Sequence, residues 1–247
     1  MVGETIKGFV LVERLGQGGM GEVWSAEQPI VKTKVAIKLL HPGISQDAAQ
    51  VERFFGEAVA VDRIKHAGIV RIFDVGLHDG RAFLIMELLE GESLRARLVR
   101  RQRLPISELA VIGRQIAGVL AATHAQGITH RDLKPDNIFL ARDAELPAGE
   151  RVKLLDFGIA KLGAAGATAS GGTLGTPRYM APELWRDAAS VDARVDLYAL
   201  GCVLCEMCAG RPPFLAQSME EACTKHLNDP APPSASSCLP RPPASRR

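Results

Sequence analysis

The run from His130 to Asn137, with the sequence HRDLKPDN, constrains this chain more than any other feature. It brings the aspartate Asp132, the lysine Lys134 and the asparagine Asn137 close together. An aspartate can accept a hydroxyl proton, a lysine can contact a phosphate, and an asparagine can hold a metal ion. Phosphoryl transfer from a nucleotide to a hydroxyl needs these three functions. Read alone, the run also fits a charged turn between a helix and a strand, so its companions decide the interpretation.

The composition is that of an ordinary globular protein. The 247 residues are 47% hydrophobic and 23% charged, which suits one large domain or two lobes. A net charge of +2 gives no reason to expect a nucleic-acid partner. No apolar run is long enough to span a bilayer, the first residues lack an apolar signal core, and the five cysteines show no disulfide framework. These features predict a cytoplasmic protein without a membrane segment.

The chain divides into two compositional halves and a tail. Residues 8–88 contain strand-like runs at 35–40 and 83–86 and one helical period from about 48 to 65. After Gly91 the pattern becomes mostly helical, with helices expected from near Pro105 to Gly127 and from about Arg194 to Ala209. Residues 230–247 contain six prolines and no apolar period, which predicts a disordered tail.

Two motifs near the N-terminus are suited to phosphate. The run LGQGGMGEV, from Leu15 to Val23, follows a GxGxxGxV pattern, and glycine lets a phosphate approach the backbone closely. The pattern also fits a dinucleotide-binding fingerprint, but a strand follows it here instead of a helix. The next strand carries Lys38 in VAIK, and the following helix carries Glu57, which can hold that ammonium. Taken singly, the two residues also fit an exposed strand lysine and a solvated helix charge.

Three motifs follow the HRDLKPDN run. Asp156 begins DFG directly after a strand, where a carboxylate can bind magnesium. Residues 175–183 read GTPRYMAPE, and Asp196 opens the late apolar helix. Each motif is weak alone. The glycine-rich run, VAIK, the helix glutamate, HRDLKPDN, DFG, GTPRYMAPE and the late aspartate occur in one order, which leaves little room for coincidence.

On these motifs the chain resembles the bacterial eukaryotic-like serine/threonine protein kinases over about residues 8–229. The resemblance implies an α+β, two-lobed protein-kinase-like fold, with a small antiparallel-sheet N-lobe with one helix at about 8–88 and a mostly helical C-lobe at about 92–229. It implies an ATP-dependent kinase that transfers the γ-phosphoryl group of Mg-ATP to serine or threonine hydroxyls of protein substrates, with ATP between the lobes.

The resemblance also assigns roles to residues. Asp132 is implied to be the base, Lys134 to contact the γ-phosphate, and Lys38, held by Glu57, to contact the other phosphates. Asn137 and Asp156 are implied to hold two Mg2+ ions. The residues implied to surround the nucleotide are Leu15, Gly16, Gly18, Gly21, Val23, Ala36, Lys38, Glu87, Leu89 and Phe139, with Met86 as gatekeeper. The side chains implied to link the lobes are Val61, Ile72, His130 and Phe157, with Asp196 tethering His130.

Regulation is implied by Arg131, which precedes the base. A phosphate on the activation segment would pair with it, and the hydroxyls expected to carry that phosphate by autophosphorylation are Thr168, Ser170 and Thr173. Thr176 is implied to lie beside Asp132 with a structural role.

The chain departs from the family pattern after residue 229, where further helices are expected. We therefore expect an incomplete C-lobe that favours self-association. The alternative function is a truncated pseudokinase or interaction module that binds nucleotide without efficient turnover. A small-molecule phosphotransferase is disfavoured because such enzymes lack the DLKP and GTPRYMAPE runs.

Two other clusters have simple interpretations. Cys202, Cys205 and Cys208 resemble iron–sulfur spacing but lie in an apolar helical stretch, which favours buried helix residues. The arginines between 95 and 103 are interpreted as a solvated helix face, with a dock for acidic substrates as the alternative.

Overall fold

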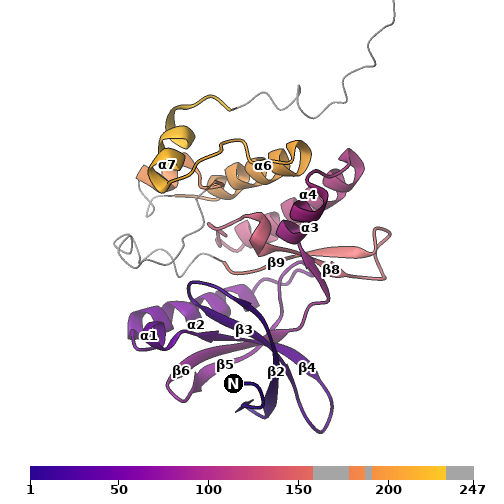
Figure 1. Cartoon of the computed structure of the whole chain (residues 1–247), viewed down its shortest axis with the longest axis vertical. Helices are drawn as coiled ribbons and strands as arrows, with labels where there is room; N and C mark the ends of the chain where they lie inside the picture. The colour runs from indigo at the N-terminus through magenta and orange to yellow at the C-terminus, as the bar shows by residue number, and fades with distance from the viewer. Residues whose placement is uncertain (158–177, 187–190, 232–247) are drawn as a thin grey trace, which may run out of the picture.

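The computed structural model describes residues 1–157, 178–186 and 191–231, and within these ranges the chain forms two lobes (Figure 1). The N-lobe contains an antiparallel sheet with the order β1-β2-β3-β4-β6-β5. Its strands are β1 (Thr5–Ile6), β2 (Phe9–Gln17), β3 (Gly21–Glu27), β4 (Lys34–Leu40), β5 (Ile72–His78) and β6 (Arg81–Glu87). Both predicted strand runs lie within this sheet, in β4 and β6.

Two helices accompany the N-lobe sheet, where the sequence predicted one. The predicted helix is α2 (Ala48–Asp62), and a one-turn helix, α1 (Pro42–Ser45), precedes it. The carboxylate of Asp47 caps α2 by accepting hydrogen bonds from the amides of Ala49 and Gln50. Such a cap stabilises a helix, because amides at its start gain a hydrogen-bond acceptor. The short α1 has no apolar period, so periodicity could not have predicted it.

Side chains on the two faces of the N-lobe sheet form separate apolar clusters. One face buries Ile6, Leu11, Trp24, Ile37 and Phe83, among others, and the other packs Leu40 and Leu84 against Phe54 and Ala58 of α2. Ile6 belongs to β1, so the packed lobe begins before residue 8.

Gly21 is required by the close approach of β3 and β4. A Cβ atom at this position would lie 2.0 Å from the carbonyl oxygen of Leu39. No side chain can occupy that position without moving the backbone, so this glycine of the glycine-rich run serves the sheet as well as the turn.

The C-lobe contains a small antiparallel sheet, β7-β8-β9, and most of the helices. Its elements are β7 (Gly91–Ser93), α3 (Leu94–Arg101), α4 (Ile106–His124), the 3-10 turn η1 (Pro135–Asn137), β8 (Ile138–Arg142), β9 (Glu150–Leu154), α5 (Pro182–Arg186), α6 (Arg194–Ala209) and α7 (Met219–Asn228). The bounds of α6 match the prediction, and Gly210, in the left-handed conformation at φ 78°, ends it. α4 matches the helix expected from Pro105.

The core of the C-lobe lies between α4 and α6. Ile112, Ile116 and Val119 of α4 share an apolar cluster with Val203 and Met207 of α6. Among the described residues, α4 is the one helix long and apolar enough to cross a membrane, with 33% of the apolar window buried inside the protein. Its place in this core explains the apolar composition.

Candidate active site

The glycine-rich run forms the turn between β2 and β3. The amide of Gly18 donates to the carbonyl of Gly21 at 2.8 Å, and the amide of Gly21 donates back at 3.3 Å. A Cβ atom at Gly16 or Gly18 would meet nothing within 4 Å, so the turn borders open space. A phosphate can therefore approach this backbone. His41, which no sequence motif indicated, lies beside the turn, with Nε2 3.0 Å from the carbonyl oxygen of Gly18.

Lys38 and Asp156 form an ion pair across the two lobes. The Nζ of Lys38 lies 2.5 Å from Oδ1 of Asp156, and the two side chains are 13% and 55% exposed. Burial opposes the charge of the ammonium, but the attraction of Asp156, with smaller effects of Glu57 and Asp132, raises the pKa of Lys38 above its ordinary value. Lys38 is therefore a cation at every physiological pH.

The expected pairing of Lys38 with Glu57 is replaced in this structure. Among the described residues, the ion pair of Lys38 is with Asp156, whereas Glu57 on α2 acts on Lys38 through its charge. Asp156 is 118 residues from Lys38 in the chain, and its approach depends on how the lobes pack. A motif in one segment therefore cannot predict which carboxylate pairs with Lys38.

The HRDLKPDN run folds around the carboxylate of Asp132. Lys134 Nζ donates to its Oδ2 at 3.1 Å, and Asn137 Nδ2 donates to the same oxygen at 2.9 Å. Asn137 Nδ2 also donates to the carbonyl oxygen of Asp132 at 2.8 Å, which closes the loop. The carboxylate is thus fixed in one orientation by two residues of the same run, a contact that the sequence analysis did not predict.

Two residues of the site have left-handed backbones. Arg131 has a φ of 62° and Asp156 a φ of 45°. Residues other than glycine avoid this conformation, which costs roughly 1–3 kcal/mol each and persists only where surrounding contacts enforce it. Arg131 directly precedes Asp132 in the HRDLKPDN run, and Asp156 begins DFG.

Asp196 anchors the loop from below, as the sequence predicted. Its carboxylate is fully buried and accepts hydrogen bonds from the amides of His130 and Arg131, both at 2.8 Å. The Nε2 of His124, at the end of α4, lies 2.7 Å from the same carboxylate. Burial lowers the pKa of His130, so its imidazole is neutral, and its Nε2 lies 3.1 Å from the carbonyl oxygen of Leu155.

An apolar stack joins the lobes behind these polar groups. The ring centroids of His130 and Phe157 are 4.6 Å apart. Phe157 shares one buried cluster with Val61 of α2, and Ile72 of β5 packs against it. The predicted grouping of these side chains is therefore present.

The residues predicted to surround adenine lie where the lobes meet. Ala36 is buried and faces Met86 across the β4–β6 pair. Glu87 ends β6, Leu89 follows in the linker, and Phe139 lies on β8. The side chain of Glu87 forms an ion pair with Lys153 of β9, an interaction that sequence reasoning missed.

A network around Arg95 of α3 was also missed. Its guanidinium donates to Glu206 at 2.8 Å and to the hydroxyl of Tyr179 at 2.7 Å, and its Nε lies 3.3 Å from Asp136 Oδ2. The hydroxyl of Tyr179 donates to Glu206 at 2.5 Å. These contacts join three segments: the HRDLKPDN loop through Asp136, the GTPRYMAPE run through Tyr179, and α6 through Glu206.

Three of the remaining arginines of the cluster form ion pairs with acids. Arg97 is 9% exposed and pairs with Glu150, Glu92 and Glu108, while Arg100 pairs with Glu92 and Arg101 with Glu108. The positive charge of these three arginines is therefore offset, which disfavours a dock for acidic substrates.

The cysteine run of α6 holds no metal-type arrangement. Burial raises the pKa of Cys202 to about 12, so this thiol stays protonated. A protonated, buried thiol behaves as a small apolar side chain. Cys205 is a free thiol.

Thr168, Ser170, Thr173 and Thr176 lie outside the described residues, as does the chain from residue 232 onward.

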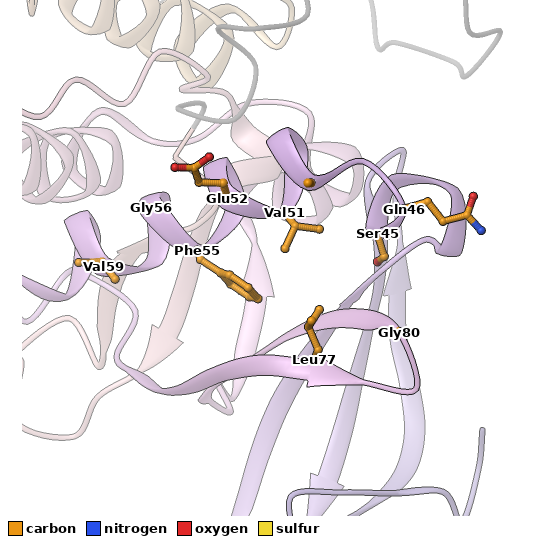
Figure 2. Close-up of a pocket in the computed structure, with 10 residues that line it drawn as sticks. Ser45, Gln46, Val51, Glu52, Phe55, Gly56, Val59, Leu77 and Gly80 are labelled. Atoms are coloured by element: carbon orange, nitrogen blue, oxygen red, sulfur yellow. The ribbon is translucent and has the colours of Figure 1, made fainter.

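A separate apolar pocket of about 590 Å³ lies in the N-lobe between α1–α2 and the β5–β6 hairpin. Figure 2 shows Phe55 of α2 pointing across it toward Leu77 of β5. None of the predicted site residues lines this pocket.

The family described as "Protein kinase domain" matches residues 9–238. The chain belongs to this family. The match begins in β2 and ends within the proline-rich segment that starts at residue 230.

Similar proteins are bacterial kinases. Serine/threonine-protein kinase Pkn1 of Myxococcus xanthus is 44% identical, in an alignment that covers 96% of this chain and 34% of Pkn1. PknD of Mycobacterium tuberculosis is 41% identical, with 94% and 34% covered. The chain thus spans about a third of the length of these relatives. A crystal structure of a double mutant of the Mycobacterium tuberculosis PknI kinase domain shares 30% identity at a TM-score of 0.72 and covers 96% of this chain and 84% of that one. This likeness confirms the two-lobed kinase fold.

Proposed function

We propose that this chain is an ATP-dependent protein serine/threonine kinase that transfers the γ-phosphoryl group of Mg-ATP to serine or threonine hydroxyls of proteins. The observation that carries the proposal is the carboxylate of Asp132, held by Lys134 and Asn137 on a loop anchored to a buried aspartate. An oriented carboxylate beside a lysine suits a reaction in which positioning provides most of the rate.

Asn137 and Asp156 are the residues we assign to Mg2+. The NH2 group of Asn137 is committed to Asp132, so the oxygen is its metal-binding atom, and the carboxylate of Asp156 is 55% exposed. Both groups are hard oxygen donors, which fits magnesium. When bound, the ion would neutralise charge on the phosphates.

Residues of the protein provide the proton acceptor and the contacts to the phosphates and the adenine. Asp132 takes the proton as the O–H bond of the substrate breaks and the new O–P bond forms. The bond between the β–γ bridging oxygen and the γ-phosphorus breaks, and ADP leaves. Lys134 contacts the γ-phosphate, and Lys38 leaves Asp156 to contact the other phosphates, while the glycine-rich turn covers them. Ala36, Met86 and Phe139, with the backbone of Glu87 and Leu89, hold the adenine.

Asp132→Asn tests the proposal. It keeps the shape of the side chain but cannot accept the proton as a carboxylate does. The variant should bind Mg-ATP with the affinity of the unmodified chain and lose at least about 100-fold in phosphorylation of a generic protein substrate. The control Asp143→Asn changes a carboxylate that pairs with Arg151 outside the site. Near-normal turnover of Asp132→Asn would overturn the assignment of the base.

We also propose autophosphorylation at Thr168, Ser170 or Thr173, with the phosphate paired to Arg131. Mass spectrometry after incubation with Mg-ATP should find phosphate on this segment. Its absence there, with full activity of Arg131→Ala, would contradict the proposal.

Two further properties are proposed from the same function. A kinase that uses ATP is expected in the cytoplasm, where that nucleotide is available. Leu197 and Leu215 of the C-lobe are 55% and 48% exposed, which supports self-association. Light scattering of the purified chain tests the second property, and a monodisperse monomer would contradict it.

The second candidate function is nucleotide binding without efficient turnover. The Lys38–Asp156 contact favours it, because the ammonium occupies one carboxylate oxygen assigned to the metal. The turnover of the unmodified chain decides between the two functions.

A further inference from the structure

The ion pair between Glu87 and Lys153 joins the end of β6 to β9. Lys153 Nζ lies 2.5 Å from Glu87 Oε1, and the side chains are 13% and 26% exposed for the lysine and the glutamate. Lys153 also donates to the carbonyl oxygen of Ile69 at 3.2 Å, and Glu87 Oε1 accepts from the amide of Arg71 at 2.8 Å. Each charge therefore has a second partner in the segment that enters β5.

The backbone around this pair is fixed as well. The amide of Glu87 donates to the carbonyl of Arg71 at 2.9 Å, and the amide of Leu154 donates to that of Gly68 at 2.8 Å. The segment 68–71 is thus held on one side by the end of β6 and on the other by β9. Because both charges have lost part of their hydration, removing either leaves the other poorly solvated.

The pair runs beside the ion pair of the active site. Glu87 faces Val35 across the β4–β6 ladder, and Lys38 lies three residues further along β4. Asp156 likewise lies three residues after Lys153. The two ion pairs therefore connect neighbouring strands of the N-lobe sheet, β4 and β6, to β9 and the residues just after it. Along β4, Lys38 and the ladder partner of Glu87 are about 10 Å apart, from the rise of a strand. One ion pair is next to the linker between the lobes, and the other is at the phosphate end of the cleft.

We propose that Glu87 and Lys153 are positioning residues that fix the spacing between the linker and Asp156. The inference rests on the proposed function. A nucleotide held at the linker through its base must reach Asp156 through its phosphates and metal, so an error in this spacing weakens Mg-ATP more than adenosine. The pair acts through the backbone it holds, because the side chains of Glu87 and Lys153 are bound to each other.

The experiment compares the affinities of the full chain for Mg-ATP and for adenosine by calorimetry. Lys153→Met and Glu87→Gln should each lower the ratio of the two affinities by about tenfold, in line with a coupling of about 1.4 kcal/mol. The double variant should lower it no further than the larger single effect, because the two side chains act as one unit. Lys153→Arg keeps the charge and should retain most of the ratio. Arg151→Met is the matched control, because it removes an ion pair from the same strand outside the cleft.

If the pair had a purely structural role, the variants would melt at a lower temperature and keep the same ratio of Mg-ATP affinity to adenosine affinity. That result in Lys153→Met, or additive effects in the double variant, would overturn the proposal. Binding of neither ligand by the unmodified chain would instead overturn the proposed function, and the role of the pair with it. Circular dichroism confirms that each variant is folded before its ratio is read.

Discussion

The ammonium of Lys38 lies 2.5 Å from Oδ1 of Asp156, so a residue of the N-lobe sheet and the first residue of DFG are joined directly. The contact places a cation beside the carboxylate assigned to the metal. In the proposed function, Lys38 would contact phosphate and Asp156 would hold the ion, so binding of Mg-ATP would replace this contact. In this structure the ion pair holds the two side chains beside each other.

Lys38→Met should abolish phosphoryl transfer while leaving the fold intact. The methionine occupies the volume of the lysine stem, and Asp156 is exposed enough to remain hydrated. We expect a loss of at least about 100-fold in turnover, the usual effect of removing one electrostatic contact to the reacting groups. Phosphorylation assays and thermal melting measure the two effects. Lys34→Met, an exposed position on the same strand, is the control, and undiminished turnover of Lys38→Met would refute the assignment.

Asp196→Asn should destabilise the protein and slow turnover together. The buried carboxylate accepts two backbone amides and faces His124, and an asparagine has one acceptor oxygen where the carboxylate has two. We expect a loss of about 1–3 kcal/mol in the free energy of unfolding. Urea denaturation measures it, with the exposed Asp192→Asn as control. Equal stability of the two variants would show that Asp196 does not hold the loop.

Arg95→Met should be far more damaging than Arg100→Met on the same helix. Arg95 neutralises Glu206, whose side chain is 7% exposed, and its loss leaves that charge buried with Tyr179 alone. The expected cost is about 3–5 kcal/mol. Arg100 is 61% exposed, and its pair with Glu92 should contribute about 0–1 kcal/mol. Similar melting temperatures for the two variants would contradict the structural role of the Arg95 network.

Stability should fall as the pH drops below about 6.5, the ordinary pKa of histidine. Burial lowers the pKa of His226, as it does that of His130. Between the ordinary pKa and the lowered pKa of the folded state, each of these histidines is protonated in the unfolded chain and neutral in the folded chain. A falling pH therefore favours unfolding across this window. His226→Gln should reduce the slope of unfolding free energy against pH between 5.5 and 6.5 by up to about one proton. An equal slope in His226→Gln and in the unmodified chain would refute the argument.

Patterns along the chain were enough to predict the main helices and strands and the family. Strand-like runs predicted β4 and β6, and helical patterns predicted α2, α4 and α6, with end signals for α4, because these patterns depend on neighbours along the chain. The order of the motifs predicted the two-lobed fold, and the hydrogen bonds within HRDLKPDN form among residues at most five positions apart. Asp196 below His130 was also anticipated, from the family resemblance.

Which distant charges meet depends on how the two lobes pack. Lys38 contacts Asp156 in place of Glu57, Arg95 reaches Glu206, and Glu87 meets Lys153, across separations of 118, 111 and 66 residues. No local period encodes such pairs. A lysine on a strand can reach any carboxylate that the packing of the lobes brings within a few ångströms, and that packing is a property of the whole apolar core. Only the assembled lobes select one partner from the several that the sequence allows.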